Sequence, residues 1–177
     1  MLNNAPEDKL QSRFFVDQTR GKSDRAVAIE AIVLLDMHLI QLLLAFMVRD
    51  PAEVSDLLGE DHPLGSFSAR IRAAYCLGLI SVDERDDLWT LKNIWEFFIH
   101  QMEDISFSNE PIRGWCQILK LPHRLMYAEG NHSERRLFVF TTAMLVHLLS
   151  IRIQQAEQTR RTAPEEFSLI SHLENEP

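Results

Sequence analysis

Residues 23–48 read SDRAVAIEAIVLLDMHLIQLLLAFMV, and this stretch decides the fold class. Its apolar side chains recur at intervals of three or four residues, which is the period of an α-helix. Segment 22–25 supplies an N-cap, and Asp50 with Pro51 stops the run. We therefore predict one long core helix near 23–49. Its inward side chains would be Ile29, Ile32, Leu35, Leu39, Leu42 and Phe46.

A second long helix is predicted from Ser133 to about Thr159. Its apolar side chains again repeat with the helical period, so one face is expected to be buried. The two long helices would pair and form the scaffold of the protein. The face predicted to be buried consists of Leu137, Phe140, Met144, Leu148 and Ile151.

Shorter helices are predicted between these two. A short helix is predicted to begin after Asp50, which would be its N-cap. Pro51 would then occupy the first helical position and Glu53 the third. A loop over 59–65 follows, and Ser66 or Ser68 then caps a helix that Gly78 ends. The inward side chains of that helix would be Ile71, Ala74, Tyr75 and Leu77.

Two further helices follow a tight junction at Leu79 and Ile80. Segment 81–84 is a capping box that opens an amphipathic helix, and Pro111 begins a shorter one. Pro122 is expected to stop that helix and leave a loop over 121–132. The buried side chains of the two helices would be Leu88, Leu91, Trp95, Phe98 and Met102, then Ile112, Trp115, Cys116 and Leu119.

We therefore predict an all-α protein with a single compact domain of six or seven helices. Residues 1–22 would form an N-terminal segment, and residues 23–160 the helical domain. Residues 161–177 would hold a short C-terminal helix, opened by the capping pattern at 162–165, and a polar tail.

The composition limits the class of function. The chain has 177 residues, of which 46% are hydrophobic and 25% charged, with a formal net charge of −8. Nucleic-acid binding draws on Lys and Arg that neutralise phosphates, so a broad DNA-binding surface is disfavoured. The short basic pairs 135–136 and 160–161 are interpreted as solvated surface.

No targeting or membrane signal is recognised in the sequence. The N-terminus lacks a basic flank followed by an apolar segment. The most apolar stretch, Met37 to Val48, is shorter than the about 20 residues that span a bilayer. Cys76 and Cys116 have no metal-ligand spacing and are interpreted as small buried side chains. We therefore expect a cytoplasmic protein without membrane association.

Segment 63–72, PLGSFSARIR, followed by CLGLI at 76–80, resembles the mannitol operon repressor family. The pattern of that family reads roughly Pro-Leu-Gly, two residues, Ser-x-Arg, then a Leu-Gly-hydrophobic-Ile turn. The resemblance spans roughly Ser23 to Leu119. The residues that carry it, which we call the family-motif residues, are Ser23, Asp24, Arg25, Asp36, Pro63, Leu64, Gly65, Phe67, Arg70, Gly78, His100 and Phe107.

The resemblance implies an all-α fold, a homo-oligomer that would be a dimer, and a role in transcriptional control through contacts with other regulatory proteins. The residues agree with this role, because no short helix pair offers a second helix with exposed base-reading Arg, Asn or Gln side chains. No cofactor is implied. We therefore predict a regulator that binds a protein partner and does not bind DNA directly.

A more distant resemblance links the chain to the HEPN superfamily, whose ribonucleases carry an Arg, four to six residues, and a His. In that chemistry the His moves a proton and the Arg stabilises phosphate charge. The matching positions here are Trp95 and His100, so the cation is missing, and Glu96 would repel a phosphate. We therefore predict that the chain is not an enzyme. The alternatives are a divergent or inactive HEPN-type ribonuclease or nucleic-acid-binding domain, and a toxin-antitoxin or defence-system scaffold.

Arg70 and Arg72 begin a helix behind the Pro-Leu-Gly loop, where backbone N–H groups favour anions. They could bind a phosphate or an acidic partner. Alternatively, Arg70 holds Asp24, Asp36 or Asp61 in an internal ion pair, and Arg25 with Asp24 has the same alternative. Asp36 is a lone acid inside an apolar face and must meet a donor, for which Arg70 is the best candidate.

His100 and Glu96 are four residues apart on one helix face and could share a metal ion. Two more ligands would have to come from His62, His123 or His132, which lack any diagnostic spacing, so we predict no metal site and no cofactor site. His38 and His147 lie within the long helices and are expected to be satisfied interior or interface side chains. Trp95 and Phe98 lie on one face of the helix and Trp89 and Phe97 on others, so they cannot all point into one core. Some of them are predicted to contribute to an interface, for which the candidates are Trp89, Trp95 and Phe97.

Overall fold

The computed structural model describes residues 16–17, 19–101, 104–125 and 132–165. Within these residues the chain forms helices and no strand, so the predicted all-α class is confirmed. The described helices are α2 (Asp24–Phe46), α3 (Pro51–Leu58), α4 (Phe67–Cys76), α5 (Val82–His100), α6 (Ile112–Gln117), α7 (Lys120–Arg124) and α8 (Glu134–Gln158).

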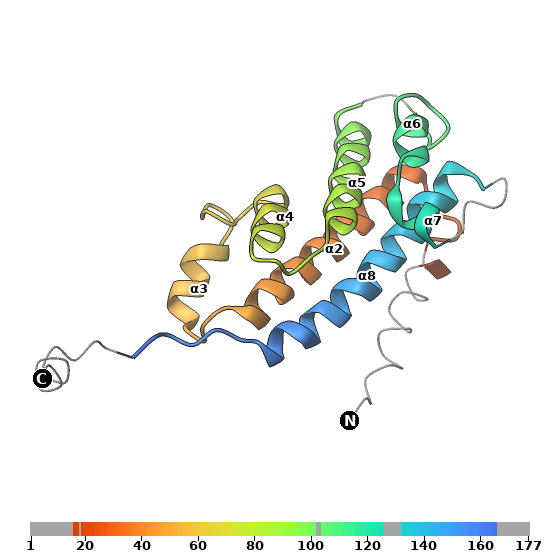
Figure 1. Cartoon of the computed structure of the whole chain (residues 1–177). Coiled ribbons are helices and arrows are strands. Elements are labelled where there is room, and N and C mark those ends of the chain that lie inside the picture. Colours follow the sequence, from red (N-terminus) through yellow and green to blue (C-terminus); the bar gives the residue numbers. More distant parts are fainter. Residues whose placement is uncertain (1–15, 18, 102–103, 126–131, 166–177) are drawn as a thin grey trace, which may run out of the picture.

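The two long helices form the scaffold, as predicted. Helices α2 and α8 run side by side and in the same direction, and α4 to α7 pack over one side of this pair, with α3 at the far end (Figure 1). The chain therefore leaves the end of α2, returns through the short helices, and enters α8 beside the start of α2. This arrangement brings both ends of α2 next to segments more than 100 residues away.

The helix starts follow the predicted caps. The Ser23 hydroxyl accepts from Ala26 N at 3.3 Å, and the Ser66 hydroxyl, rather than that of Ser68, accepts from Ala69 N at 3.2 Å. Ser81 and Glu84 form the expected capping box. The Ser133 hydroxyl caps α8 by accepting from Arg136 N. Each cap satisfies backbone N–H groups that have no partner inside their own helix, which fixes where the helix begins.

The predicted buried faces of the long helices were partly wrong. Ile29 is 39% exposed, while Val27, Ala28 and Ala31 are buried instead. In α8 the predicted face is only half-buried, and the fully buried face, turned roughly to the other side, contains Phe138, Leu145, Val146 and Leu149. Both helices are apolar nearly all round, so periodicity alone does not select the face that packs.

The shorter elements show further differences. Leu77 is 44% exposed because the chain has already left α4, and Ile94 rather than Trp95 is buried in α5. Pro122 lies within α7, not in a loop, because a proline in the first turn of a helix removes no hydrogen bond. Residues 160–165 form no helix, so the predicted C-terminal helix does not begin at 162, and its remainder and Met102 lie outside the described residues.

Helices α2 and α8 are long and apolar enough to cross a membrane by length and composition, with mean hydropathies of 2.0 and 1.6 over their most apolar windows. The prediction that no segment is long enough to span a bilayer considered only Met37 to Val48, which is shorter than either of these helices. Half of each window is buried inside the fold. Core helices of globular proteins meet the same criterion, so these two helices are weak evidence for a membrane.

Candidate partner-binding surface

Asp36 and Arg70 form the predicted internal ion pair. Arg70 Nη1 lies 2.6 Å and 2.8 Å from the two carboxylate oxygens of Asp36, and Arg70 Nη2 donates to Leu58 O at 3.0 Å. The Arg70 side chain is only 8% exposed. Because its guanidinium joins α2, α4 and the end of α3 internally, Arg70 is not available to bind a phosphate on the surface.

The Pro-Leu-Gly loop packs tightly against α3. Leu64 N donates to Leu57 O at 2.9 Å, and Gly65 N donates to His62 O at 2.8 Å. A Cβ at Gly65 would lie 2.5 Å from Gly59 O and closer still to Glu60 O, so any other residue would displace backbone. Gly78 has φ +71° just after α4, a conformation that glycine adopts without strain. These family-motif residues therefore build the turns of the fold.

A second polar cluster lies at the start of α2. One carboxylate oxygen of Asp24 pairs with Arg135 of α8, and the other accepts from Phe107 N at 2.9 Å. Arg135 Nη2 also donates to Thr19 O and Lys22 O. Arg25 Nη2 donates to Gln101 O at 2.7 Å. The interpretation of Arg135 as solvated surface was therefore wrong, because its guanidinium joins three segments.

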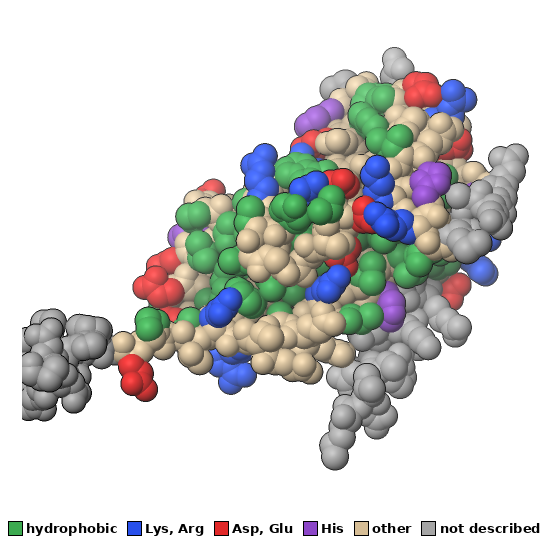
Figure 2. Space-filling view, viewed as in Figure 1, with side chains coloured by type: hydrophobic (Ala, Val, Ile, Leu, Met, Phe, Trp, Pro, Cys, Tyr) green, Lys and Arg blue, Asp and Glu red, His purple; other side chains and the backbone are tan. Residues whose placement is uncertain are grey.

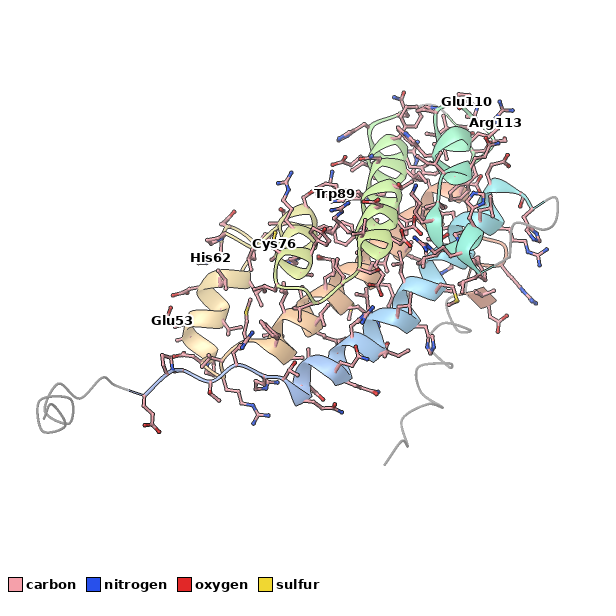
Figure 3. All side chains as sticks on the ribbon, viewed as in Figure 1. Glu53, His62, Cys76, Trp89, Glu110 and Arg113 are labelled. Atoms are coloured by element: carbon pink, nitrogen blue, oxygen red, sulfur yellow. The ribbon has the colours of Figure 1, made fainter. Side chains whose placement is uncertain are left out.

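Arg72 and Trp89 lie at the surface between α4 and α5. The Arg72 guanidinium carbon is 5.2 Å from the centre of the Trp89 ring, and Lys92 Nζ is 5.7 Å from it. Trp89 lies on the side of α5 that faces α4 (Figure 3). The two cations that flank this half-buried ring form cation–π contacts with it, so it is partly covered within the chain itself.

His100 and Glu96 lie together in a shallow cleft between α5 and α6. The cleft has a volume of about 270 Å³ and is lined by Asn93, Glu96, Phe97, His100, Gln101 and Trp115. The Phe97 and Trp115 rings meet edge to face at 5.9 Å, and Glu96 is held by Lys92 at 2.5 Å. Trp95 does not line this cleft, because positions 95 and 100 are roughly 140° apart around a helix.

The cleft offers aromatic surface with a polar rim, and none of its lining residues is Lys or Arg. It therefore suits an apolar group better than a phosphate. Within the part of the chain that the structure describes, no group of three His, Cys, Asp or Glu side chains could hold a metal ion. His62 lies beside α3, far from the end of α5 that holds His100 (Figure 3).

The sequence profile of the mannitol repressor family matches residues 19–161 of the chain. The chain belongs to the mannitol repressor family. It is 32% identical over 109 residues to the mannitol operon repressors of Escherichia coli strains K12 and O6:H1. These alignments cover 59% of this chain and 56% of each relative, so the match spans about half the length of the curated relatives.

The fold is also that of a solved relative. The protein in the X-ray structure of the MtlR-HPr complex from Escherichia coli superposes with a TM-score of 0.63 at 23% sequence identity. The match covers 81% of this chain and 99% of that one. At this identity the likeness establishes the fold alone. The relatives found by sequence are described as mannitol operon repressors and not as enzymes.

The burial of two acids of α5, Asp87 and the capping-box residue Glu84, was not predicted from the sequence. Asp87 is 0% exposed and accepts from Lys120 N at 2.6 Å and Leu121 N at 2.8 Å, so it caps α7. Glu84 is 2% exposed and lies within 3.5 Å of the Arg152 guanidinium. Both acids lie on the same face of α5 as the buried side chains of Leu88 and Leu91. An acid on an apolar face, the signal used for Asp36, would have identified them.

The two histidines of the long helices differ. His38 is buried and its Nδ1 lies 2.8 Å from Leu34 O, so it is a satisfied interior side chain, as predicted. His147 Nδ1 is buried and has no hydrogen-bond partner in the described part of the chain. The interior alternative is therefore not met at this atom, and the interface alternative for His147 stays a prediction.

Proposed function

We propose that the chain is a transcriptional regulator of the mannitol-repressor type that acts in the cytoplasm by binding another protein. The family match over residues 19–161 carries this proposal. We assign the function to the helical domain, residues 23–160. The relative with the same fold forms a complex with HPr, and we propose an HPr-type protein as the partner of this chain too.

The use of the basic side chains supports a protein partner over direct DNA reading. Arg70, Arg135 and Arg160 donate to internal acceptors, and the guanidiniums of Arg72 and Arg85 lie over aromatic rings. The interpretation of Arg160 as solvated surface was wrong, because it caps the carboxyl end of α2. The chain as a whole has 26 acidic against 18 basic side chains, and this excess of negative charge disfavours binding to phosphates.

The same reasoning supports a non-enzymatic role. His100 is exposed at the end of α5, and its cleft brings Glu96, two amides and two aromatic rings around it. A ribonuclease of the HEPN type needs a cation where phosphate charge develops, and the position that would supply it is Trp95. We propose that the cleft has no ribonuclease activity.

The partner proposal is tested by titrating the full chain with HPr from the same organism in a calorimeter, together with operator fragments of a neighbouring sugar operon. We expect saturable HPr binding, and operator binding no tighter than binding to random DNA. Tight operator binding without HPr binding would overturn the proposal. RNA cleavage that disappears in His100→Ala would overturn the non-enzymatic role.

We also propose that the chain is a homodimer. The outer side of α2 presents four apolar side chains at helical spacing, and they are 39–56% exposed: Ile29, Val33, Met37 and Leu44. An apolar stripe on a long helix is a common basis for association. We expect sedimentation to show a dimer and Val33→Lys to shift it to a monomer. A wild-type chain that sediments as a monomer at every concentration would contradict this.

A further inference from the structure

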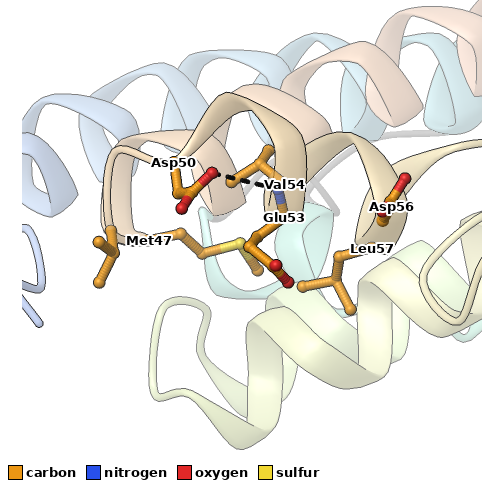
Figure 4. Close-up of a pocket in the computed structure, with 7 residues that line it drawn as sticks. Met47, Asp50, Glu53, Val54, Asp56 and Leu57 are labelled. Atoms are coloured by element: carbon orange, nitrogen blue, oxygen red, sulfur yellow. Dashed lines mark hydrogen bonds between the residues drawn. The ribbon is translucent and has the colours of Figure 1, made fainter.

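A groove between the end of α2 and α3 combines an apolar floor with an acidic rim. It has a volume of about 440 Å³, within the range of ligand-binding clefts. Its apolar lining residues, here called the floor, are Met47, Val48, Val54 and Leu57, and its acidic lining residues, here called the rim, are Asp50, Glu53 and Asp56. Figure 4 shows the Glu53 side chain next to Met47 and Leu57. Acidic side chains also gather over α3 on the molecular surface (Figure 2).

The floor is held in place by the fold but remains open to solvent. Met47 and Val54 pack against the core from one side, while Val48 is 38% exposed. The segment after α8 closes the other side of this corner, because Arg160 Nη1 donates to Met47 O at 3.1 Å and Arg161 N donates to Phe46 O at 2.8 Å. The groove is therefore a preformed feature of a rigid corner.

The rim acids have different roles. The Asp50 carboxylate accepts from Ala52 N and Glu53 N and so caps α3. Glu53 and Asp56 are exposed and form no ion pair with the described residues. Arg49 is exposed and lies in the chain between the lining residues Val48 and Asp50, so the groove has one neighbouring cation against three acids. Arg160 donates to Leu44 O, and Arg161 lies over the Phe46 ring. Two carboxylates are thus available at the rim.

We propose that this groove binds a basic amphipathic segment of a partner protein, with an aliphatic side chain on the floor and Lys or Arg against Glu53 and Asp56. The negative charge of the rim distinguishes among the molecules that could occupy the groove. Nucleic acid and anionic membrane would be repelled by the rim. Residues 166–177 of the chain itself carry three glutamates and no Lys or Arg, so they have the wrong charge. The proposal stands independently of the regulatory role and of HPr binding.

The probe is a synthetic amphipathic peptide of Leu and Lys, compared with a counterpart in which every Lys is Glu. Binding to the full chain is followed by amide chemical shifts. We expect shift changes confined to residues 47–57, with the acidic counterpart binding at least about tenfold more weakly, since opposite-sign pairs attract where like pairs repel. Raising the salt to about 1 M should weaken binding strongly, because screening then extends over only about 3 Å.

The variants are Glu53→Lys with Asp56→Lys, which should weaken binding about tenfold, and Leu57→Asn, which should weaken it without changing its salt dependence. Glu157→Lys on the exposed surface of α8 is the matched control and should bind like the wild type. Equal binding of both peptides, or unchanged binding by the rim variant, would overturn the proposal. Concentration-dependent shifts of residues 47–57 without peptide would assign the groove to a second copy and also overturn it.

Discussion

Arg70 Nη1 of α4 lies within 2.8 Å of both carboxylate oxygens of Asp36 on α2, while its Nη2 donates to the last carbonyl of α3. One guanidinium thus fixes the relative positions of three helices. The Arg70 side chain is almost fully buried, whereas that of Asp36 is 26% exposed. Water therefore reaches the pair from the side of the Asp36 carboxylate.

Removing one partner of this pair should be costly. We expect Arg70→Met to lower the free energy of unfolding by about 3 kcal/mol, because it leaves a largely desolvated carboxylate without its cation. The double variant Arg70→Met with Asp36→Leu should regain part of that loss, because no buried charge remains. Urea unfolding of the two variants measures both. A single variant as stable as wild type would contradict the role assigned to the pair.

Asp24 should stabilise the end of the fold where α2 and α8 begin. Asp24→Ala removes the ion pair to Arg135 and the acceptor for Phe107 N, so we expect a loss of about 2 kcal/mol. Asp17→Ala is the control, because among the described residues the ion-pair partner of Asp17 is the exposed Arg20 at 3.6 Å. Hydrogen exchange of the Phe107 amide should accelerate in Asp24→Ala and stay unchanged in the control.

Asp87 should give the stability a defined pH dependence. Burial raises the pKa of its carboxyl above 3.8, although hydrogen bonds from Lys120 N and Leu121 N oppose this, and nearby Asp83 and Asp86 add to the rise. The folded state then holds the proton more tightly than the unfolded state. The contribution of this group to stability is therefore largest below pH 3.8 and is lost as the pH rises through the folded-state pKa.

The comparison is with Asp87→Asn, which cannot titrate and keeps a single acceptor oxygen. We expect the variant to be less stable by about 1–2 kcal/mol, because one of two buried N–H groups loses its partner. The stability difference, wild type minus variant, should decrease as the pH rises above 3.8 and then level off. A difference that increases with pH over that window would show that the hydrogen bonds, rather than burial, dominate.

The two cysteines should differ in reactivity. Burial, with a smaller contribution from Glu134, raises the pKa of the Cys116 thiol to about 12, whereas Cys76 is exposed. The expectation that both are buried was therefore wrong for Cys76. Since the thiolate is the reactive form, we expect a thiol reagent at pH 8 to label one cysteine in the folded chain and both in denaturant. In Cys76→Ser the folded chain should remain unlabelled.

Local chemistry made most of the helices predictable. Ser23, Ser81 and Ser133 cap their helices through hydrogen bonds to residues three positions away, so the sequence pattern contains the whole interaction. The same holds for Gly78, whose positive φ ends α4. The pair Asp36 and Arg70 was predictable for a different reason, because a single acid on an apolar helix face requires a buried donor.

The sequence by itself determined the all-helical class, the starts of the serine- and aspartate-capped helices, the family and the need for a donor at Asp36, because these depend on short-range chemistry and composition. The tertiary structure alone decided which side of α2 and α8 is buried, since both helices are apolar nearly all round. It also decided that Asp24 meets Arg135, 111 residues away, and that Glu53 and Asp56 share a rim with Met47. Such partners depend on how the helices pack, and no local spacing encodes that geometry.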